Sequence, residues 1–303
     1  MALFALLSWL RRLAYRNGIY ASHKMSVPVI VVGNISVGGN GKTPLVVYLC
    51  DLLRQQGYYP GVLSRGYGGK SRQYPLAVGA HTHSDEVGDE PLLIKKRVNC
   101  PVVVDPKRPR GAQSLIEDHH CNIIICDDGL QHYALQRDIE IIVMDGQRRL
   151  GNGQLLPVGP LREGPWRLKQ ADFVVINGGE TQNGEYRMSL ESGRLVNVKF
   201  PTQSRSISDI NTAVTIAAGI GHPERFFSVL RGKGVKIKQT LSFPDHYQYK
   251  TGDLPEDTVL MTEKDAVKCQ AFASDNWWFL PVSANLTAQF KTKLLEKLKQ
   301  IKK

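Results

Sequence analysis

Runs of apolar, β-branched residues alternate with helical stretches along the first half of the chain. Candidate strands lie at 28–32, 61–64, 101–105, 122–127, 140–145 and 173–177. Several of these runs are apolar without alternation, which is typical of strands buried on both faces of a sheet. The segments between them at 44–56, 86–98 and 107–118 are predicted to be helices. This order predicts an α/β fold with a mostly parallel sheet and helices on both of its sides.

The alternation stops between residues 146 and 167, where the chain reads GQRRLGNGQLLPVGPLREGPWR. Glycine and proline punctuate this stretch, which predicts a long loop. Loops of this length are usually functional or connect domains. Beyond it the pattern resumes more weakly, with strands expected at 214–218, 259–262 and 277–280 and helices at 223–230, 264–271 and 287–301. A second, smaller α/β unit is therefore expected.

The N-terminus begins with an apolar stretch of helical periodicity, MALFALLSWLRRLAYRNGIY. Trp9 and Tyr15 favour a lipid–water boundary, and arginines follow. The uncharged run has about half of the ~20 residues needed to span a bilayer. No charged region precedes it and no small-residue cleavage site follows, so a secretory signal is not expected. An interfacial helix on an anionic leaflet is the preferred interpretation, and a helix that caps the core is the alternative.

The net charge of +11 indicates an anionic partner, which nucleic acid, an acidic membrane or a phosphorylated substrate would satisfy. No alternating basic and aromatic pattern selects nucleic acid, so none is expected. The five cysteines form no C-x-x-C pair, which argues against a zinc ribbon or a redox motif. Scattered thiols in odd number fit a reducing compartment.

The sharpest feature is the segment VIVVGNISVGGNGKT at 29–43, in which a buried strand leads through a glycine cluster into a helix. Backbone amides of such a loop surround phosphate oxygens, and the following helix directs its positive end at them. Lys42 is expected to reach the β- and γ-phosphates, and Thr43 to bind Mg²⁺. The usual motif has glycine where this chain has Ser36. The predicted nucleotide-binding residues are Ser36, Val37, Gly38, Gly39, Asn40, Gly41, Lys42 and Thr43.

A second acidic feature is the strand at 122–127, which ends in Asp127-Asp128-Gly129. Ligands of parallel sheets collect at the carboxyl ends of the strands, which places Asp127 near the phosphate loop. There it could hold Mg²⁺ directly or through water. The alternative is a solvated turn, because Asp-Gly is a common turn pair.

Eight segments together resemble the tetraacyldisaccharide 4′-kinase family. They are GNISVGGNGKTP (33–44), SRGYGGK (64–70), GDEP (88–91), DDGLQH (127–132), DGQRRLGNGQLLPVGPLRE (145–163), AGIGHPERFF (218–227), FPDH (243–246) and MTEKDAVKC (261–269). They follow one another through most of the chain. The resemblance implies transfer of the ATP γ-phosphate to the 4′-hydroxyl of a tetraacylated disaccharide 1-phosphate, which gives lipid IVA in lipid A synthesis.

The resemblance also implies roles for single residues. Lys42 and Thr43 would hold phosphate and Mg²⁺, and Asp127 with Asp128 would form the metal neighbourhood. Asp89 would be the base or its partner, with His246 completing a dyad. The catalytic set is thus Asp89, His246, Lys42 and Asp128, the metal ligands are Thr43 and Asp127, and Ser64 and Arg162 lie in the substrate cleft. The arginines between 148 and 167 could also bind the substrate's 1-phosphate.

On this basis three segments are expected: a membrane-associating helix at 1–24, a P-loop kinase core at 25–165, and a smaller α/β domain at 166–303 that closes the active-site cleft. The implied cofactors are ATP and Mg²⁺. The implied partners are the lipid disaccharide 1-phosphate and an anionic membrane surface, at the cytoplasmic face of the Gram-negative inner membrane. The chain is expected to be a monomer.

Two other functions fit the phosphate loop and Asp127. One is a P-loop ATPase that acts as a switch or a metal chaperone, although the cysteine spacing offers no metal-rich motif. The other is a nucleotide-binding module at a membrane surface without catalysis. Segment 262–265, TEKD, resembles base-reading loops of other P-loop proteins, but the sequence alone does not identify the adenine contacts.

Overall fold

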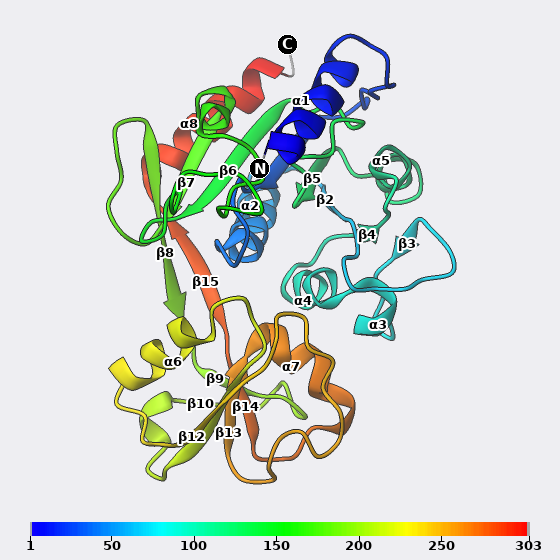
Figure 1. Cartoon of the computed structure of the whole chain (residues 1–303). Coiled ribbons are helices and arrows are strands. Elements are labelled where there is room, and N and C mark those ends of the chain that lie inside the picture. Colours follow the sequence, from blue (N-terminus) through cyan, green and yellow to red (C-terminus); the bar gives the residue numbers. More distant parts are fainter. Residues whose placement is uncertain (1, 302–303) are drawn as a thin grey trace.

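The computed structural model describes residues 2–301, whose strands form two sheets. The larger sheet has nine strands in the order β15-β8-β7-β6-β1-β5-β2-β4-β3, and the smaller has six in the order β10-β9-β14-β13-β11-β12. Figure 1 shows the two sheets in separate units, with β8 and β15 running from the larger toward the smaller. The predicted α/β class with a mostly parallel sheet is confirmed.

The larger sheet contains β1 (Val29–Gly33), β2 (Pro60–Ser64), β3 (Leu76–Ala77), β4 (Val102–Val104), β5 (Ile123–Asp127), β6 (Ile139–Asp145), β7 (Phe173–Asn177), β8 (Glu185–Ser192) and β15 (Val282–Leu286). The smaller sheet contains β9 (Leu195–Asn197), β10 (Ser204–Arg205), β11 (Val214–Ala218), β12 (Ile237–Ser242), β13 (Val259–Thr262) and β14 (Trp277–Leu280). The α-helices are α1 (Ala2–Arg16), α2 (Lys42–Gln55), α3 (Ser84–Val87), α4 (Asp89–Arg97), α5 (Arg108–Glu117), α6 (Pro223–Gly232), α7 (Glu263–Cys269) and α8 (Ala288–Ile301). Short 3₁₀ helices lie at Pro165–Gln170, Ile207–Asp209 and Gln270–Phe272.

Strand β1 lies in the middle of the larger sheet and pairs in parallel with β5 and β6. All five residues of β1 are buried, because α2, α4 and α8 cover one face of the sheet and α5 covers the other. The parallel register sets Val32 opposite Asp127, so the phosphate loop after β1 and the two acids after β5 leave the sheet at the same edge. This topology positions the site.

The division between the sheets does not fall near residue 165. Strands β7, β8 and β15, together with α8, belong to the larger sheet and its core, although all lie beyond that residue. The smaller unit is an insertion at about 195–280, entered after β8 and left through β14. The reason is that β15 returns to pair antiparallel with β8 and packs against α2, and Phe290 of the following α8 contacts Tyr48 of α2.

The single helix expected at 86–98 is two helices, α3 and α4, separated at Gly88. Gly88 has a φ of 85°, and a Cβ there would lie 2.3 Å from the carbonyl oxygen of Tyr67. Only glycine tolerates both the left-handed backbone and this approach. The break starts a new helix at Asp89, so this carboxylate sits at the positive end of the α4 dipole.

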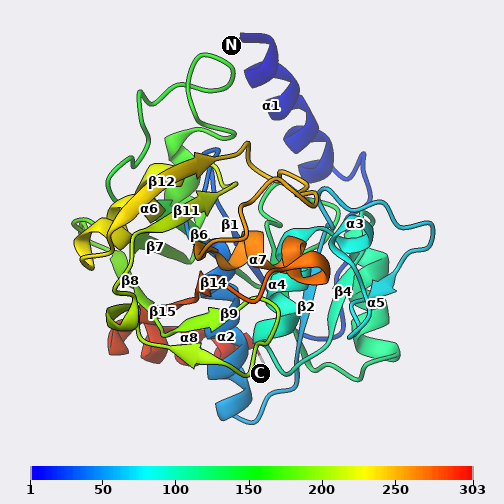
Figure 2. The same ribbon diagram turned by 90° about the horizontal axis from the view of Figure 1, so that it is seen from below.

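Helix α1 projects from the larger unit at one edge of the molecule (Figure 2). Its C-terminal half is attached to the body, since the Arg12 guanidinium stacks on the Trp166 ring and Tyr15 contacts the Tyr133 ring. Its outer face leaves four large apolar side chains about half exposed: Leu6, Leu7, Trp9 and Leu10. Among residues 2–301 none of the helices is long and apolar enough to cross a bilayer.

Candidate active site

The phosphate loop is held in place by its own polar side chains and by the long loop that follows β6. Asn40 Nδ2 donates to the carbonyl oxygens of Ser36 and Gly38, and the Val37 amide donates to Pro160. Ser36, the residue that departs from the usual motif, is buried and pairs with Leu161 in a short antiparallel bridge. It supports the loop, whereas residues 37–43 line the cavity.

Gly41 is the point where the loop turns into α2. Its φ is 92°, and a Cβ there would lie 2.5 Å from Nδ2 of Asn177, which donates to the carbonyl of Asn40. Arg148 lies on the outer side and donates to the carbonyl of Gly39. In these contacts the backbone carbonyls of residues 36, 38, 39 and 40 accept hydrogen bonds from side chains. The amides of the loop and the positive end of α2 are left to bind an anion.

Lys42 extends toward the acids at the end of β5. Its Nζ lies 3.4 Å from Asp128 Oδ1, and the other oxygen of Asp128 lies 3.4 Å from Nη1 of Arg162. Burial raises the pKa of Asp128, but Lys42 and Arg162 outweigh it, and the pKa lies below its ordinary value. Lys42 and Arg162, both expected at the site, thus pair with the same Asp128 carboxylate.

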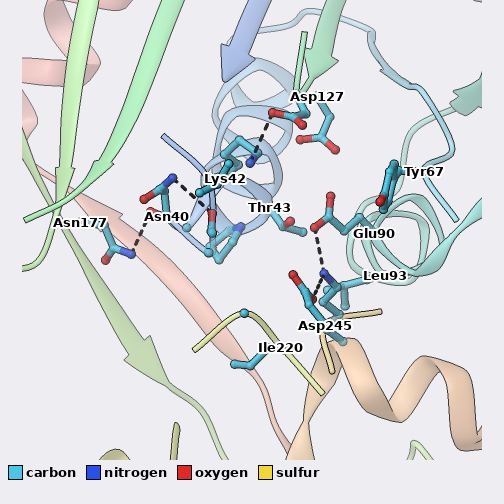
Figure 3. A pocket seen from close by; sticks show the side chains of 18 of the residues that line it. Asn40, Lys42, Thr43, Tyr67, Glu90, Leu93, Asp127, Asn177, Ile220 and Asp245 are labelled. Atoms are coloured by element: carbon cyan, nitrogen blue, oxygen red, sulfur yellow. Dashed lines mark hydrogen bonds and ion pairs between the residues drawn. The ribbon is translucent and has the colours of Figure 1, made fainter. Parts of the chain in front are cut away.

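Asp127 has the opposite surroundings. Its side chain is buried, and among residues 2–301 neither carboxylate oxygen has a hydrogen-bond donor. Burial raises its pKa to about 7, and the charges of Glu90 and Asp128 add to this effect. A buried carboxylate without a donor fits a site for a cation, since an ionised oxygen otherwise has nothing to replace water. Figure 3 shows Asp127, Thr43 and Lys42 facing the same space.

In the part of the chain that the structure describes, no group of three or more His, Cys, Asp or Glu side chains could hold a metal ion by itself. Thr43 and Asp127 therefore fit the partial ligand set of a Mg²⁺ that is bound together with a nucleotide. In such sites phosphate oxygens and water complete the coordination.

The second centre joins the two units. Asp89 at the start of α4 is buried, and its two carboxylate oxygens lie 2.9 and 3.0 Å from Nδ1 of His246, which follows β12 in the smaller unit. Burial alone raises the pKa of Asp89, but the hydrogen bond from His246 and the charge of Lys264 lower it below the ordinary value. The hydrogen bond to Asp89 in turn raises the pKa of His246. The pair expected from the resemblance is thus formed, and Asp89 is ionised at neutral pH.

Lys264 is a residue of this centre that the sequence did not single out. Its Nζ lies 3.2 Å from Glu90, 3.2 Å from Asp245 and 3.5 Å from Nε2 of His246. The segment TEKD therefore places a cation at the Asp89–His246 pair. Thr262 caps α7 by accepting a hydrogen bond from the Asp265 amide, and the Asp265 carboxylate accepts one from the Gly219 amide. The sequence gives no sign that segment 262–265 lies against segment 88–91 in the folded protein.

Both centres line one cavity of about 1320 Å³ between the units. Ser64, at the carboxyl end of β2, and Arg162 lie on its wall, as does the α1 side chain of Phe4. Of the other arginines in the loop after β6, Arg149 pairs with Glu185 and Arg167 is buried against Glu140. These two, with Arg148 on the phosphate loop, are engaged within the protein, whereas Arg162 lies on the cavity wall.

A phosphate loop on a parallel sheet, with a lysine, strand-end acids and a carboxylate–histidine pair across one cleft, defines a P-loop phosphotransferase. The model of the family "Tetraacyldisaccharide-1-P 4′-kinase" matches residues 1–299. The chain belongs to this family. It is an ATP-dependent kinase of lipid A synthesis that phosphorylates tetraacyldisaccharide 1-phosphate at the 4′ position.

Individual relatives agree with this assignment. The tetraacyldisaccharide 4′-kinase of Pseudoalteromonas atlantica is 60% identical over 300 residues, covering 99% of this chain and 98% of the relative. That of Tolumonas auensis is 52% identical, covering 99% and 92%. The crystal structure of the Aquifex aeolicus LpxK in complex with ATP has a TM-score of 0.83 at 32% identity, covering 98% of this chain and 96% of that one.

Proposed function

We propose that the Asp89–His246 pair takes the proton of the 4′-hydroxyl while Lys42, Thr43 and Asp127 hold the triphosphate and Mg²⁺. The observation that carries this proposal is the position of the two centres in one cavity, with one carboxylate already paired and the other lacking any donor. Phosphoryl transfer depends on position and charge more than on covalent help from the protein. The cavity supplies both.

The bond changes are simple. The 4′-oxygen attacks the γ-phosphorus as its proton passes to Asp89, the bond between the γ-phosphorus and the bridging oxygen breaks, and ADP leaves. Lys42, 12% exposed, lies where it can neutralise charge that develops on the phosphate oxygens. Mg²⁺ would be held by Thr43 and Asp127, and when bound it neutralises charge on the phosphates. Asp128 positions Lys42 through an ion pair, and Arg162 holds Asp128 through a second one.

The decisive experiment incubates the chain with Mg-ATP and the disaccharide 1-phosphate lipid and measures the mass of the lipid product. Gain of one phosphate at the 4′ position supports the proposal. Release of free phosphate with an unchanged lipid would instead indicate an ATPase switch, the alternative that the phosphate loop alone permits.

We also propose that the chain works as a monomer on an anionic membrane, at the cytoplasmic face of the Gram-negative inner membrane. The half-exposed apolar face of α1, followed by Arg11, Arg12 and Arg16, supports this placement. Four acyl chains would not leave a bilayer readily, at ~0.8 kcal/mol per CH₂ group. The domain roles follow: α1 contacts lipid, the larger unit holds nucleotide, and the smaller unit brings His246 to the cleft.

Deleting residues 1–20 is expected to release the protein from vesicles that contain anionic lipid while ATP binding is retained. Sedimentation with the vesicles and calorimetry of Mg-ATP binding give the two readouts. A truncated chain that still sediments fully with the vesicles contradicts the assignment of α1.

A further inference from the structure

Lys264 lies at the start of α7, where its ammonium group is surrounded by acids from both units. Glu90 Oε1 and Asp245 Oδ1 are each 3.2 Å from Nζ, and Asp89 Oδ2 is 3.8 Å away. The side chain is only 15% exposed. Burial lowers the pKa of Lys264, but Glu90, Asp89 and Asp245 outweigh it and the pKa lies above its ordinary value. The ammonium group is therefore permanently charged.

This arrangement makes Lys264 a bridge between the units. Glu90 belongs to α4 of the larger unit, whereas Asp245 and His246 belong to the loop after β12 in the smaller one. Figure 3 shows Glu90 and Asp245 converging from opposite sides on a single ammonium group. Without that cation, three carboxylates would face one another across the cleft and repel. With three acids around it, the ammonium group is neutralised and is poorly suited to bind phosphate.

We propose that Lys264 is a positioning residue of the phosphoryl transfer, which holds the Asp89–His246 pair together across the cleft. The inference rests on the proposed role of that pair. The contact is direct, since Nζ lies 3.8 Å from Asp89 and 3.5 Å from Nε2 of His246. Lys264 thus acts on the reaction through Asp89 and His246, without touching the reacting atoms.

The consequence for pH can be worked out from the charges that face the pair. These are Glu90 on α4, Asp245 next to His246, and Lys264 and Lys268 on α7. The Tyr67 ring, 5.0 Å from the His246 ring, adds no charge at neutral pH. Removing Lys264 removes a positive charge, so the protonated forms of both Asp89 and His246 become easier to populate. Because the two groups titrate together, the acid limb of kcat/KM should move to higher pH.

The test compares Lys264→Met, which keeps the length of the stem, with Lys264→Arg, which keeps the charge. Lys264→Met should lower kcat by ~10–100-fold, in line with a small misplacement of reacting groups. It should leave the KM for ATP unchanged and move the acid limb up by about one pH unit. Lys264→Arg should keep the native pH profile and recover most of kcat. Lys96→Met is the matched control, because the exposed Lys96 joins α4 to Gln270 away from the pair.

A native pH profile of kcat/KM in Lys264→Met overturns the proposal. An equal loss of kcat in Lys264→Met and Lys264→Arg overturns it too. If Lys264→Met shows no thermal stabilisation by Mg-ATP, Asp245→Asn decides instead. That variant has the same size and removes a negative charge 3.9 Å from His246, so it should move the acid limb to lower pH. An unmoved limb there overturns the proposal. Asp89→Asn tests the proposed base separately from the role of Lys264, since full activity in that variant contradicts Asp89 as the base.

Discussion

Asp127 and Asp89 are both buried carboxylates, 1% and 3% exposed, and they differ in the partners that the fold gives them. Asp127 lies on the wall of the cleft, whereas Asp89 reaches it through His246. Asp89 has an imidazole within hydrogen-bond distance and an ammonium group 3.8 Å away. Among the described residues none donates a hydrogen bond to Asp127, and burial, with the charges of Glu90 and Asp128, raises its pKa to about 7. The first carboxylate has its counter-charges within the protein, whereas the second is neutralised by a proton or by a cation that the proposed site would bind.

The difference is instructive because burial of an unpaired charge is costly. A protein retains such a group where a ligand compensates it, so Asp127 is a stronger sign of a metal than its turn sequence is. Asp89, the proposed base, shows the converse. A base must be ionised before the substrate arrives, and the fold supplies the counter-charges of Asp89.

The largest effect on activity is expected from a substitution that breaks the Asp89–His246 pair. Asp89→Asn keeps the size of the side chain but removes the proton acceptor, so kcat should fall by ~10²–10⁴-fold, the range for general-base catalysis. Calorimetry should show unchanged affinity for Mg-ATP, because Asp89 faces His246 and not the phosphate loop. A variant that loses nucleotide affinity in parallel would mean that Asp89 belongs to the metal site.

Lys42→Met tests the phosphate loop as the nucleotide-binding site. Loss of one preorganised charge at the phosphates should lower kcat/KM for ATP by ~10²–10³-fold, with both kcat and KM affected. Steady-state kinetics over a range of ATP concentrations separate the two constants. Arg149→Met, which removes a nearby ion pair with Glu185 outside the cleft, is the control. A change confined to kcat in Lys42→Met would contradict its role in binding the triphosphate.

Asp127→Asn should have opposite effects on stability and on metal binding. In the absence of Mg²⁺ the amide removes an uncompensated buried charge, so the free energy of unfolding at pH 8 should rise by about 1–3 kcal/mol. The native pKa is raised above the unfolded value, so Asp127 binds more protons when folded. Stability is therefore expected to fall as pH rises from about 4 to 7 in the unaltered chain.

Urea unfolding at several pH values, with and without Mg-ATP, measures both effects. The Asp127→Asn variant should lose that part of the pH dependence and most of the stabilisation by Mg-ATP. A variant that is less stable than the unaltered chain at pH 8 without Mg²⁺ would show that Asp127 is already compensated in the folded state.

The apolar strands were predictable because their residues are buried on both faces and need no partner information. Runs at 28–32, 61–64, 122–127 and 173–177 correspond to β1, β2, β5 and β7. Strand β8, EYRMSLES, was missed because only every second residue is apolar, so it lacks the continuous apolar run of the inner strands; its alternation is that of a half-buried strand. Strand β15 was missed for the same reason. These two strands decide where the small unit begins and ends, so the domain boundary was misplaced with them.

The sequence alone determined the local chemistry: a glycine loop that ends in Gly41-Lys42-Thr43, a strand that ends in two acids, and the family to which these segments belong. Tertiary structure decided which charges meet. Asp89 and His246 are 157 residues apart, and Lys264 reaches Glu90 across 174. Pairing over such separations depends on how two units pack, because a carboxylate's pKa and its role are set by the charges within a few ångströms of it and not by its neighbours in the chain.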